Sequence, residues 1–187
     1  MKTHRQLMTE QVLIAALQDD IQQKQAFQTL VETYQERLYW HIRKLVLNHE
    51  DANDVIQNTF IKAWKGLKNF RTDAKLYTWL YRIATNESLT FIQNRKKKHA
   101  ESFDEGEAYS PAKQLKADQY FDGSEAEIKL FKALETLPEK QRVVFQLRYF
   151  EELKYEDIAE ITDTSVGALK ASYHHAVKKI EHFILEH

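Results

Sequence analysis

Apolar residues recur at steps of three and four along most of the chain, which is the period of amphipathic α-helices. In the first half, the pattern predicts a long helix over Lys24–Leu47 and a second helix that Asp51 opens and that runs to Trp64. A third helix is expected over Lys75–Arg95, after a loop at Gly66–Asp73, and a short helix over Thr9–Leu17 precedes the others. Trp79 and Leu80 are expected in the core.

A second group of helices is predicted in the last third of the chain. Ser124, with Glu127 three residues later, has the pattern of a capping box. Helices are expected at 124–134, 139–150, 155–162 and 166–182. The last two, joined by the turn at 163–165 with Ser165 as a cap, form a helix-turn-helix, whose second helix enters the DNA major groove. An ordinary αα-hairpin fits the same pattern and stays an alternative.

The stretch 99–124 differs from both flanks. It holds two of the four Gly and one of the two Pro, and it has no sustained apolar period, so it is predicted to be a flexible acidic linker. We therefore expect an all-α chain with one helical domain at 1–98 and another at 125–187. The small number of Gly and Pro residues disfavours turn-rich β-sandwiches and barrels.

The net charge of the chain is −1, but the charge is unevenly distributed. Residues 62–98 contain 10 Lys or Arg and 2 Asp or Glu, a balance of +8, whereas every other segment is acidic. The same residues include six aromatic side chains. Cations suit phosphates and flat rings suit unstacked bases, so this segment indicates binding of single-stranded or melted nucleic acid. A helical core with a solvated basic face explains the charge equally well.

The composition excludes several kinds of chemistry. Without Cys, the chain has no disulfide, no Cys-ligated metal site and no thiol nucleophile. The eight His are scattered, and no Gly-rich phosphate loop is present, so we expect no enzyme activity, no catalytic residue, no metal and no cofactor. No apolar run approaches the ~20 residues of a membrane span. A cytoplasmic protein without membrane insertion is predicted.

Three stretches carry a resemblance to a known family. Asp51–Trp64, Phe70–Asn86 and Leu137–Lys170 are similar, in this order, to regions 2.2, 2.3–2.4 and 4 of bacterial RNA polymerase sigma factors of the extracytoplasmic-function (ECF, group IV) subfamily. The resemblance implies two small helical domains, a region 2 bundle and a region 4 helix-turn-helix, joined by the linker. It also implies a factor that binds core RNA polymerase and directs promoter recognition, −10 melting and initiation, with no small-molecule substrate.

The resemblance further implies roles for individual residues. The partners are the β′ clamp and β flap of the polymerase, promoter DNA and, as often in the family, an anti-sigma factor. The residues matching the clamp-binding helix are Asp51, Asp54 and Gln57. Those expected at the −10 element are Phe70, Arg71, Lys75, Arg82, Asn86, Arg95, Lys96, Lys97 and Lys98, with Asn86 in the pocket of a flipped-out base. Those expected at the −35 element are Lys170, Ser172, His174, His175 and Lys178.

The recognition helix departs from the family pattern. Ser172, His175 and Val177 stand where arginines are usual, so this domain alone should bind DNA weakly, because phosphate contacts dominate affinity. Two other readings remain open from the sequence. One is a helix-turn-helix regulator that binds duplex DNA without joining polymerase, which would call for an α/β receiver or a ligand pocket before it. The other is a protein-interaction bundle, which leaves the basic segment unexplained.

Overall fold

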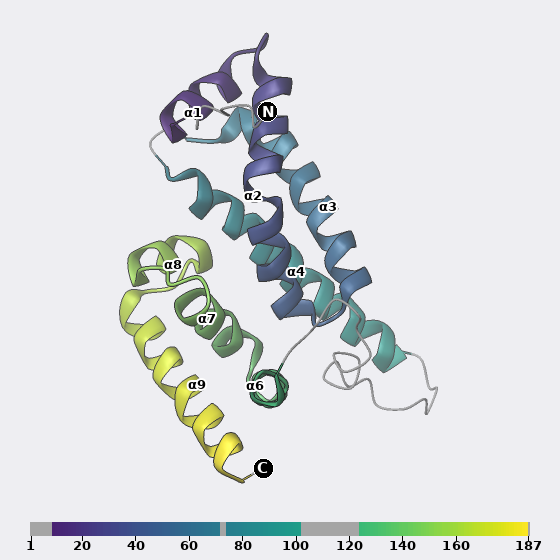
Figure 1. Cartoon of the computed structure of the whole chain (residues 1–187), viewed down its shortest axis with the longest axis vertical. Coiled ribbons are helices and arrows are strands. Elements are labelled where there is room, and N and C mark those ends of the chain that lie inside the picture. The colour runs from purple at the N-terminus through teal and green to yellow at the C-terminus, as the bar shows by residue number, and fades with distance from the viewer. Residues whose placement is uncertain (1–8, 72–73, 102–123, 187) are drawn as a thin grey trace.

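The computed structural model describes residues 9–71, 74–101 and 124–186, and every regular element within them is helical (Figure 1). The predicted all-α class is confirmed. Of the predicted linker 99–124, the first three residues continue a helix and Ser124 is a helix cap, while 102–123 lie outside the described residues. The elements are α1 (Glu10–Gln18), α2 (Gln23–Val46), α3 (His49–Gly66), η1 (Leu67–Asn69), α4 (Leu76–Glu101), α6 (Glu125–Glu135), α7 (Glu139–Tyr149), α8 (Tyr155–Thr162) and α9 (Val166–Glu186).

The helix ends differ from the sequence pattern where side-chain caps or polar turns extend them. The helix α3 begins at His49 rather than Asp51, because the Asn48 side-chain oxygen accepts a hydrogen bond from the Asp51 N–H at 3.0 Å. The helix α4 continues to Glu101, six residues beyond the predicted end at Arg95, so the whole basic run Arg95–Lys98 is helical. The predicted capping box of α6 is confirmed, with Ser124 and Glu127 bonded in both directions.

The helices α1 to α4 form what we call the N-terminal bundle. The helix α2 packs against α1, α3 and α4, and α3 packs against α4. Leu30, Leu38, Ile42 and Leu80 are completely buried between them. The apolar stripes at three- and four-residue steps therefore face one another, as the sequence pattern requires.

The helices α6 to α9 form the C-terminal bundle. The helix α9 packs against α6, α7 and α8, and α8 and α9 have the order of a helix-turn-helix. The turn between them uses Asp163 in a left-handed conformation (φ 52°), and the Ser165 hydroxyl accepts from the Ala168 N–H at 3.4 Å. The predicted cap of α9 is thus present.

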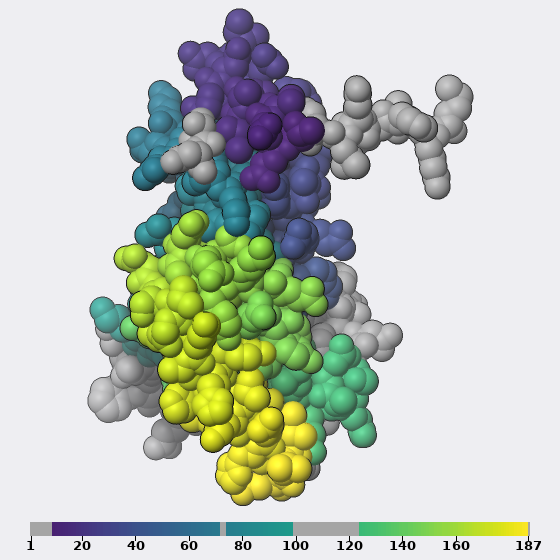
Figure 2. All heavy atoms as spheres, turned by 90° about the vertical axis from the view of Figure 1, so that its left-hand side faces the viewer, coloured from purple at the N-terminus to yellow at the C-terminus, as the bar shows by residue number. Residues whose placement is uncertain are grey.

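The two bundles lie against each other. The helix α8 contacts α4, and α7 contacts α2, so the C-terminal bundle covers part of the N-terminal one (Figures 1 and 2). The apolar core continues across the contact, because Val143, Leu147 and Ile158 join the cluster that contains Leu80 and Ala84. In the opposite direction, Leu47 at the end of α2 is buried among residues of the C-terminal bundle.

Polar groups ring this apolar contact. The Asp157 carboxylate accepts from the Lys75 ammonium and from the Tyr77 hydroxyl, each at 2.6 Å. The Glu151 carboxylate accepts from the Tyr81 hydroxyl at 2.5 Å and lies 3.8 Å from the Lys44 ammonium. Burial by itself would raise the pKa of Asp157, but the hydrogen bonds from Lys75 and Tyr77 outweigh it and hold that pKa below its ordinary value. The ion pair of Lys75 and Asp157 is therefore charged at neutral pH.

A buried histidine between α2 and α4 is held neutral. His41 is fully buried, its ring centroid 4.9 Å from that of Tyr81 and its Nε2 atom 3.0 Å from the Thr85 hydroxyl. Burial, assisted by the nearby Lys44 ammonium, lowers the pKa of His41 to about 3. The imidazolium is thus strongly disfavoured in the folded chain.

Stability should fall on acidification through His41. The unfolded chain takes up a proton near pH 6.5, whereas folded His41 resists it down to about pH 3, so folding is opposed across this window. We expect wild type to lose about 2 kcal/mol more unfolding free energy than His41→Gln between pH 7.5 and 5. Urea titrations at several pH values measure this. The exposed control His174→Gln should keep the wild-type slope, and identical slopes in all three proteins would contradict the assignment.

The carboxylates at the contact should hold the bundles together. We expect the double variant Asp157→Asn, Glu151→Gln to separate them more readily, since neutral amides are weaker acceptors for Lys75, Lys44 and the two tyrosines. Small-angle X-ray scattering should show a larger radius of gyration. The neighbouring exposed pair Glu156→Gln, Glu152→Gln removes the same charge and should leave the radius unchanged. A radius that moves equally in both double variants would point to net charge instead.

Candidate nucleic-acid interface

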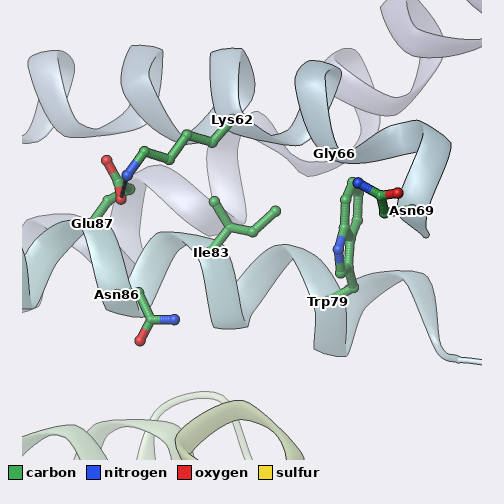
Figure 3. Close-up of a pocket in the computed structure, with 7 residues that line it drawn as sticks. All are labelled: Lys62, Gly66, Asn69, Trp79, Ile83, Asn86 and Glu87. Carbon is green, nitrogen blue, oxygen red and sulfur yellow. Dashed lines mark hydrogen bonds and ion pairs between the residues drawn. The ribbon is translucent and has the colours of Figure 1, made fainter. Parts of the chain in front are cut away.

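A cavity of about 350 Å³ opens where the end of α3 and η1 meet the middle of α4 (Figure 3). Trp79, Ile83 and Asn86 reach it from α4 because steps of three and four residues lie on one face of a helix. Its volume falls within the range of ordinary small-ligand pockets, ~300–1,000 Å³. The lining residues are Lys62, Gly66, Asn69, Trp79, Ile83, Asn86 and Glu87.

The Trp79 ring forms one wall of this pocket. It packs against Phe70, with ring centroids 4.9 Å apart, and lies beside Asn69 (Figure 3). Gly66 makes the close approach of the ring possible, because a Cβ atom there would lie 3.2 Å from the Trp79 Cζ2 atom. Trp79, expected in the core, is thus half-buried and lines the pocket, whereas Leu80 is buried as predicted.

Polar groups mark the rest of the pocket. Lys62 and Glu87 form an ion pair across α3 and α4. The Asn86 side chain is exposed and points away from α3 (Figure 3), and within the described part of the chain its amide has no hydrogen-bond partner. The aromatic wall can stack on a planar base, and the Asn86 amide, at the pocket edge about two turns along α4 (Figure 3), offers a donor and an acceptor for a polar edge once its side chain turns toward the pocket.

The other residues predicted at the −10 element follow the length of α4 and the loop before it. Arg71, Arg82, Lys97 and Lys98 are exposed, as a phosphate-binding role requires. Phe70 is only 5% exposed, and its ring packs on Trp79 instead of facing solvent. Phe70 therefore supports the pocket wall in this conformation.

Among the described residues, several of the predicted DNA-binding cations bind carboxylates of the chain itself. Lys75 binds Asp157. Lys96 binds Glu139 at 2.6 Å, and Arg95 binds Asp51. Sequence reasoning did not find Asp157 or Glu139. Each is an ordinary acidic residue in the first turn of a helix, and each lies far along the chain from its partner. No local signal could have revealed these pairs.

The residues predicted to bind polymerase lie on α3. Asp54 and Gln57 are exposed, so the structure leaves them available to a partner. Asp51 is half-buried, and burial raises its pKa above the ordinary value even though the Arg95 guanidinium opposes this shift. Its ion pair with Arg95 thus connects the predicted polymerase-binding residues of α3 with the predicted −10-binding residues of α4, which the sequence analysis treated separately.

The residues predicted at the −35 element lie on α9. Lys170, His174, His175 and Lys178 are exposed, and Ser172 is half-buried. The rings of His174 and His175 are 6.0 Å apart, and the Lys170 ammonium lies 5.8 Å from the centroid of the Tyr155 ring on α8. Lys170, His174 and Lys178, at steps of four, thus share one exposed face of α9, whereas Ser172 lies on another side of the helix.

Comparison with known proteins assigns both bundles. Residues 30–98 match the family model for Sigma-70 region 2, and residues 127–180 match that for Sigma-70, region 4. The chain is 34% identical over 186 residues to the ECF RNA polymerase sigma-E factor of Haemophilus influenzae, covering 95% of this chain and 98% of that protein. It is also 34% identical to the RNA polymerase sigma-H factor of Pseudomonas aeruginosa, covering 84% and 86%.

A solved structure supports the same assignment. The sigma factor RpoE in complex with the anti-sigma factor NepR, from Bartonella quintana, superposes with a TM-score of 0.68 at 27% identity, covering 84% of this chain and 96% of that one. The fold and its two matched regions define a sigma factor, a non-enzymatic class of transcription initiation factors. The chain belongs to the ECF family of RNA polymerase sigma factors.

Two negative findings concern the described residues. None of their helices is long and apolar enough to cross a bilayer. In the same ranges, no three His, Asp or Glu side chains lie close enough to hold a metal ion.

The tight contact at Gly66 should be measurable as an asymmetry between two glycines. Gly167→Ala places its Cβ in open space, so we expect α9 to gain about 0.5–1 kcal/mol from the lower entropy of alanine. Gly66→Ala must displace the Trp79 ring, so its unfolding free energy should come out about 1 kcal/mol or more below that of Gly167→Ala. Urea unfolding of both variants tests this, and equal stabilisation would mean that the ring moves freely.

Proposed function

We propose that this ECF sigma factor holds a flipped-out base of the melted −10 strand in the pocket beside Trp79 and Asn86. The observation that carries the proposal is that one pocket is lined both by the Trp79 ring and by the exposed Asn86 amide, which lies about two turns further along α4 at the pocket edge (Figure 3) and would turn inward to meet the base. A base leaving the duplex needs an apolar face for stacking and polar groups for its edge, and these side chains supply both.

The cations of α4 would hold the backbone of the same strand. Arg82, Lys97 and Lys98 are exposed along the helix that carries Asn86. Lys75 and Lys96 would join them only after phosphate replaces the carboxylates of Asp157 and Glu139. Promoter binding along α4 is therefore expected to compete with the contact between the bundles.

The remaining surfaces fit the other partners of a sigma factor. The exposed face of α3 with Asp54 and Gln57 would bind the β′ clamp of core RNA polymerase, and the polar face of α9 would bind the −35 duplex. The C-terminal bundle would also bind the β flap. An anti-sigma factor is a further proposed partner, because the similar RpoE structure contains one. Action with polymerase implies a cytoplasmic location and no chemistry of its own.

Loss of the Asn86 amide should impair melting more than assembly. With core polymerase and a promoter fragment selected by the wild-type holoenzyme from random duplexes, Asn86→Ala should reduce open-complex formation about tenfold, the value of one good base contact. Permanganate footprinting of unpaired thymines measures melting, and gel filtration with core enzyme measures assembly. Asn94→Ala, the same change at an exposed position two turns further along α4, should behave as wild type.

The reciprocal variant separates the two surfaces. Asp54→Lys reverses a charge on α3 and should weaken binding to core polymerase, while any holoenzyme that forms still melts the promoter. An equal loss of assembly and melting in Asn86→Ala would overturn the pocket assignment.

A further inference from the structure

We propose that the N-terminal helix α1 is a positioning element for the −10 loop, acting through Glu10 and Gln18. The −10 loop is here the connection from α3 to α4, and the proposal concerns only its described parts, residues 67–71 and 74–76. This inference rests on the proposed function of the pocket, because it assigns α1 a part in shaping that pocket.

Both ends of the −10 loop are bonded to α1. The Glu10 carboxylate accepts from the backbone N–H of Leu76 at 2.8 Å, and the Gln18 amide donates to the backbone carbonyl of Leu67 at 3.3 Å. The two side chains stand at opposite ends of α1, which spans Glu10–Gln18. The helix thus bridges the start and the end of the loop.

The bond from Glu10 replaces a cap that the local sequence does not provide. Leu76 is the first residue of α4, so its N–H has no partner within the helix. Lys75 precedes it and carries no side-chain acceptor, in contrast to the usual Ser, Thr, Asp or Asn. A carboxylate from a helix more than sixty residues away both accepts this hydrogen bond and suits the positive end of the α4 dipole.

The two bonds from α1 matter because a pocket-lining residue lies close to each of the bonded positions, Leu67 and Leu76. Asn69 belongs to η1, just after Leu67, whereas Trp79 belongs to the first turn of α4, just after Leu76. The helix α1 is itself fixed by Leu13 and Leu17, which are buried in the N-terminal core. Because α1 is fixed in this way, its two hydrogen bonds set the spacing between Asn69 and Trp79.

Variants at the two bonds test the proposal in the full chain with core polymerase and the selected promoter fragment. Glu10→Ala should lower open-complex formation about fivefold, the effect of losing one cap. Gln18→Ala should lower it about three- to fivefold, the effect of losing one neutral hydrogen bond. Core binding should stay unchanged. Glu10→Gln keeps an acceptor and should restore most of the activity, and Gln11→Ala, an exposed neighbour on α1, should match wild type.

Amide hydrogen exchange gives a readout that a general loss of stability would not produce. In Glu10→Ala, exchange should accelerate in peptides containing Leu76 and Tyr77 and stay unchanged in peptides from the middle of α4. The positioning role would be overturned if promoter opening fell only in proportion to the thermal stability of the protein and Glu10→Gln did not restore it. Asn86→Ala separates a failure of this inference from a failure of the proposed function. If promoter melting is lost in Asn86→Ala but intact in Glu10→Ala, the role of α1 is refuted and the proposed function of the pocket stands.

Discussion

The packing of α4 on both of its sides is the constraint on which the rest of the structure depends. One side of this helix fills the N-terminal core with Leu80 and Ala84, while Tyr77 and Tyr81 hydrogen-bond to carboxylates of the C-terminal bundle. A third strip, with Trp79 and Ile83, faces the pocket, and Asn86 lies at its edge (Figure 3). Because a rigid helix transmits any shift along its length, docking of the C-terminal bundle and the shape of the pocket are mechanically connected.

The sequence predicts what local patterns determine. The period of the apolar residues located each described α-helix, although α4 ends six residues beyond its predicted end, and the short η1 lies in a predicted loop. The capping box at Ser124 and Glu127 was visible as a pair. The bonds that shape the site are of another kind. Asp157 meets Lys75 across 82 positions, and Glu10 meets Leu76 across 66, so only the packed helices bring them together. Acidic residues in first turns suggest helix starts and nothing more.

The charge analysis also needs the structure to be interpreted. A balance of +8 over residues 62–98 indicated a strongly positive surface. In the described part of the chain, some of these cations lie against carboxylates. Lys62 and Arg95 do so within the N-terminal bundle, and Lys75 and Lys96 do so across the bundle contact. The field that a phosphate chain meets is therefore weaker than the count implies. It depends on whether the bundles touch, because two of the pairs exist only then.

At Leu47, the cost of a strained backbone is set against the gain from burying the side chain in the contact between the bundles. This residue ends α2 in the left-handed region (φ 65°), which a branched side chain adopts at a cost of about 1–3 kcal/mol. In that conformation the leucine is 1% exposed and lies with Phe131 and Phe145 of the other bundle, a burial that contributes about 1.5–3 kcal/mol. The two amounts nearly cancel. The left-handed turn belongs to the connection between α2 and α3, both within the N-terminal bundle, so it stays in place when a partner separates the bundles. The burial that offsets its strain is present only while the bundles are docked, so such a partner must supply this energy in addition to that of the apolar packing and ion pairs around it.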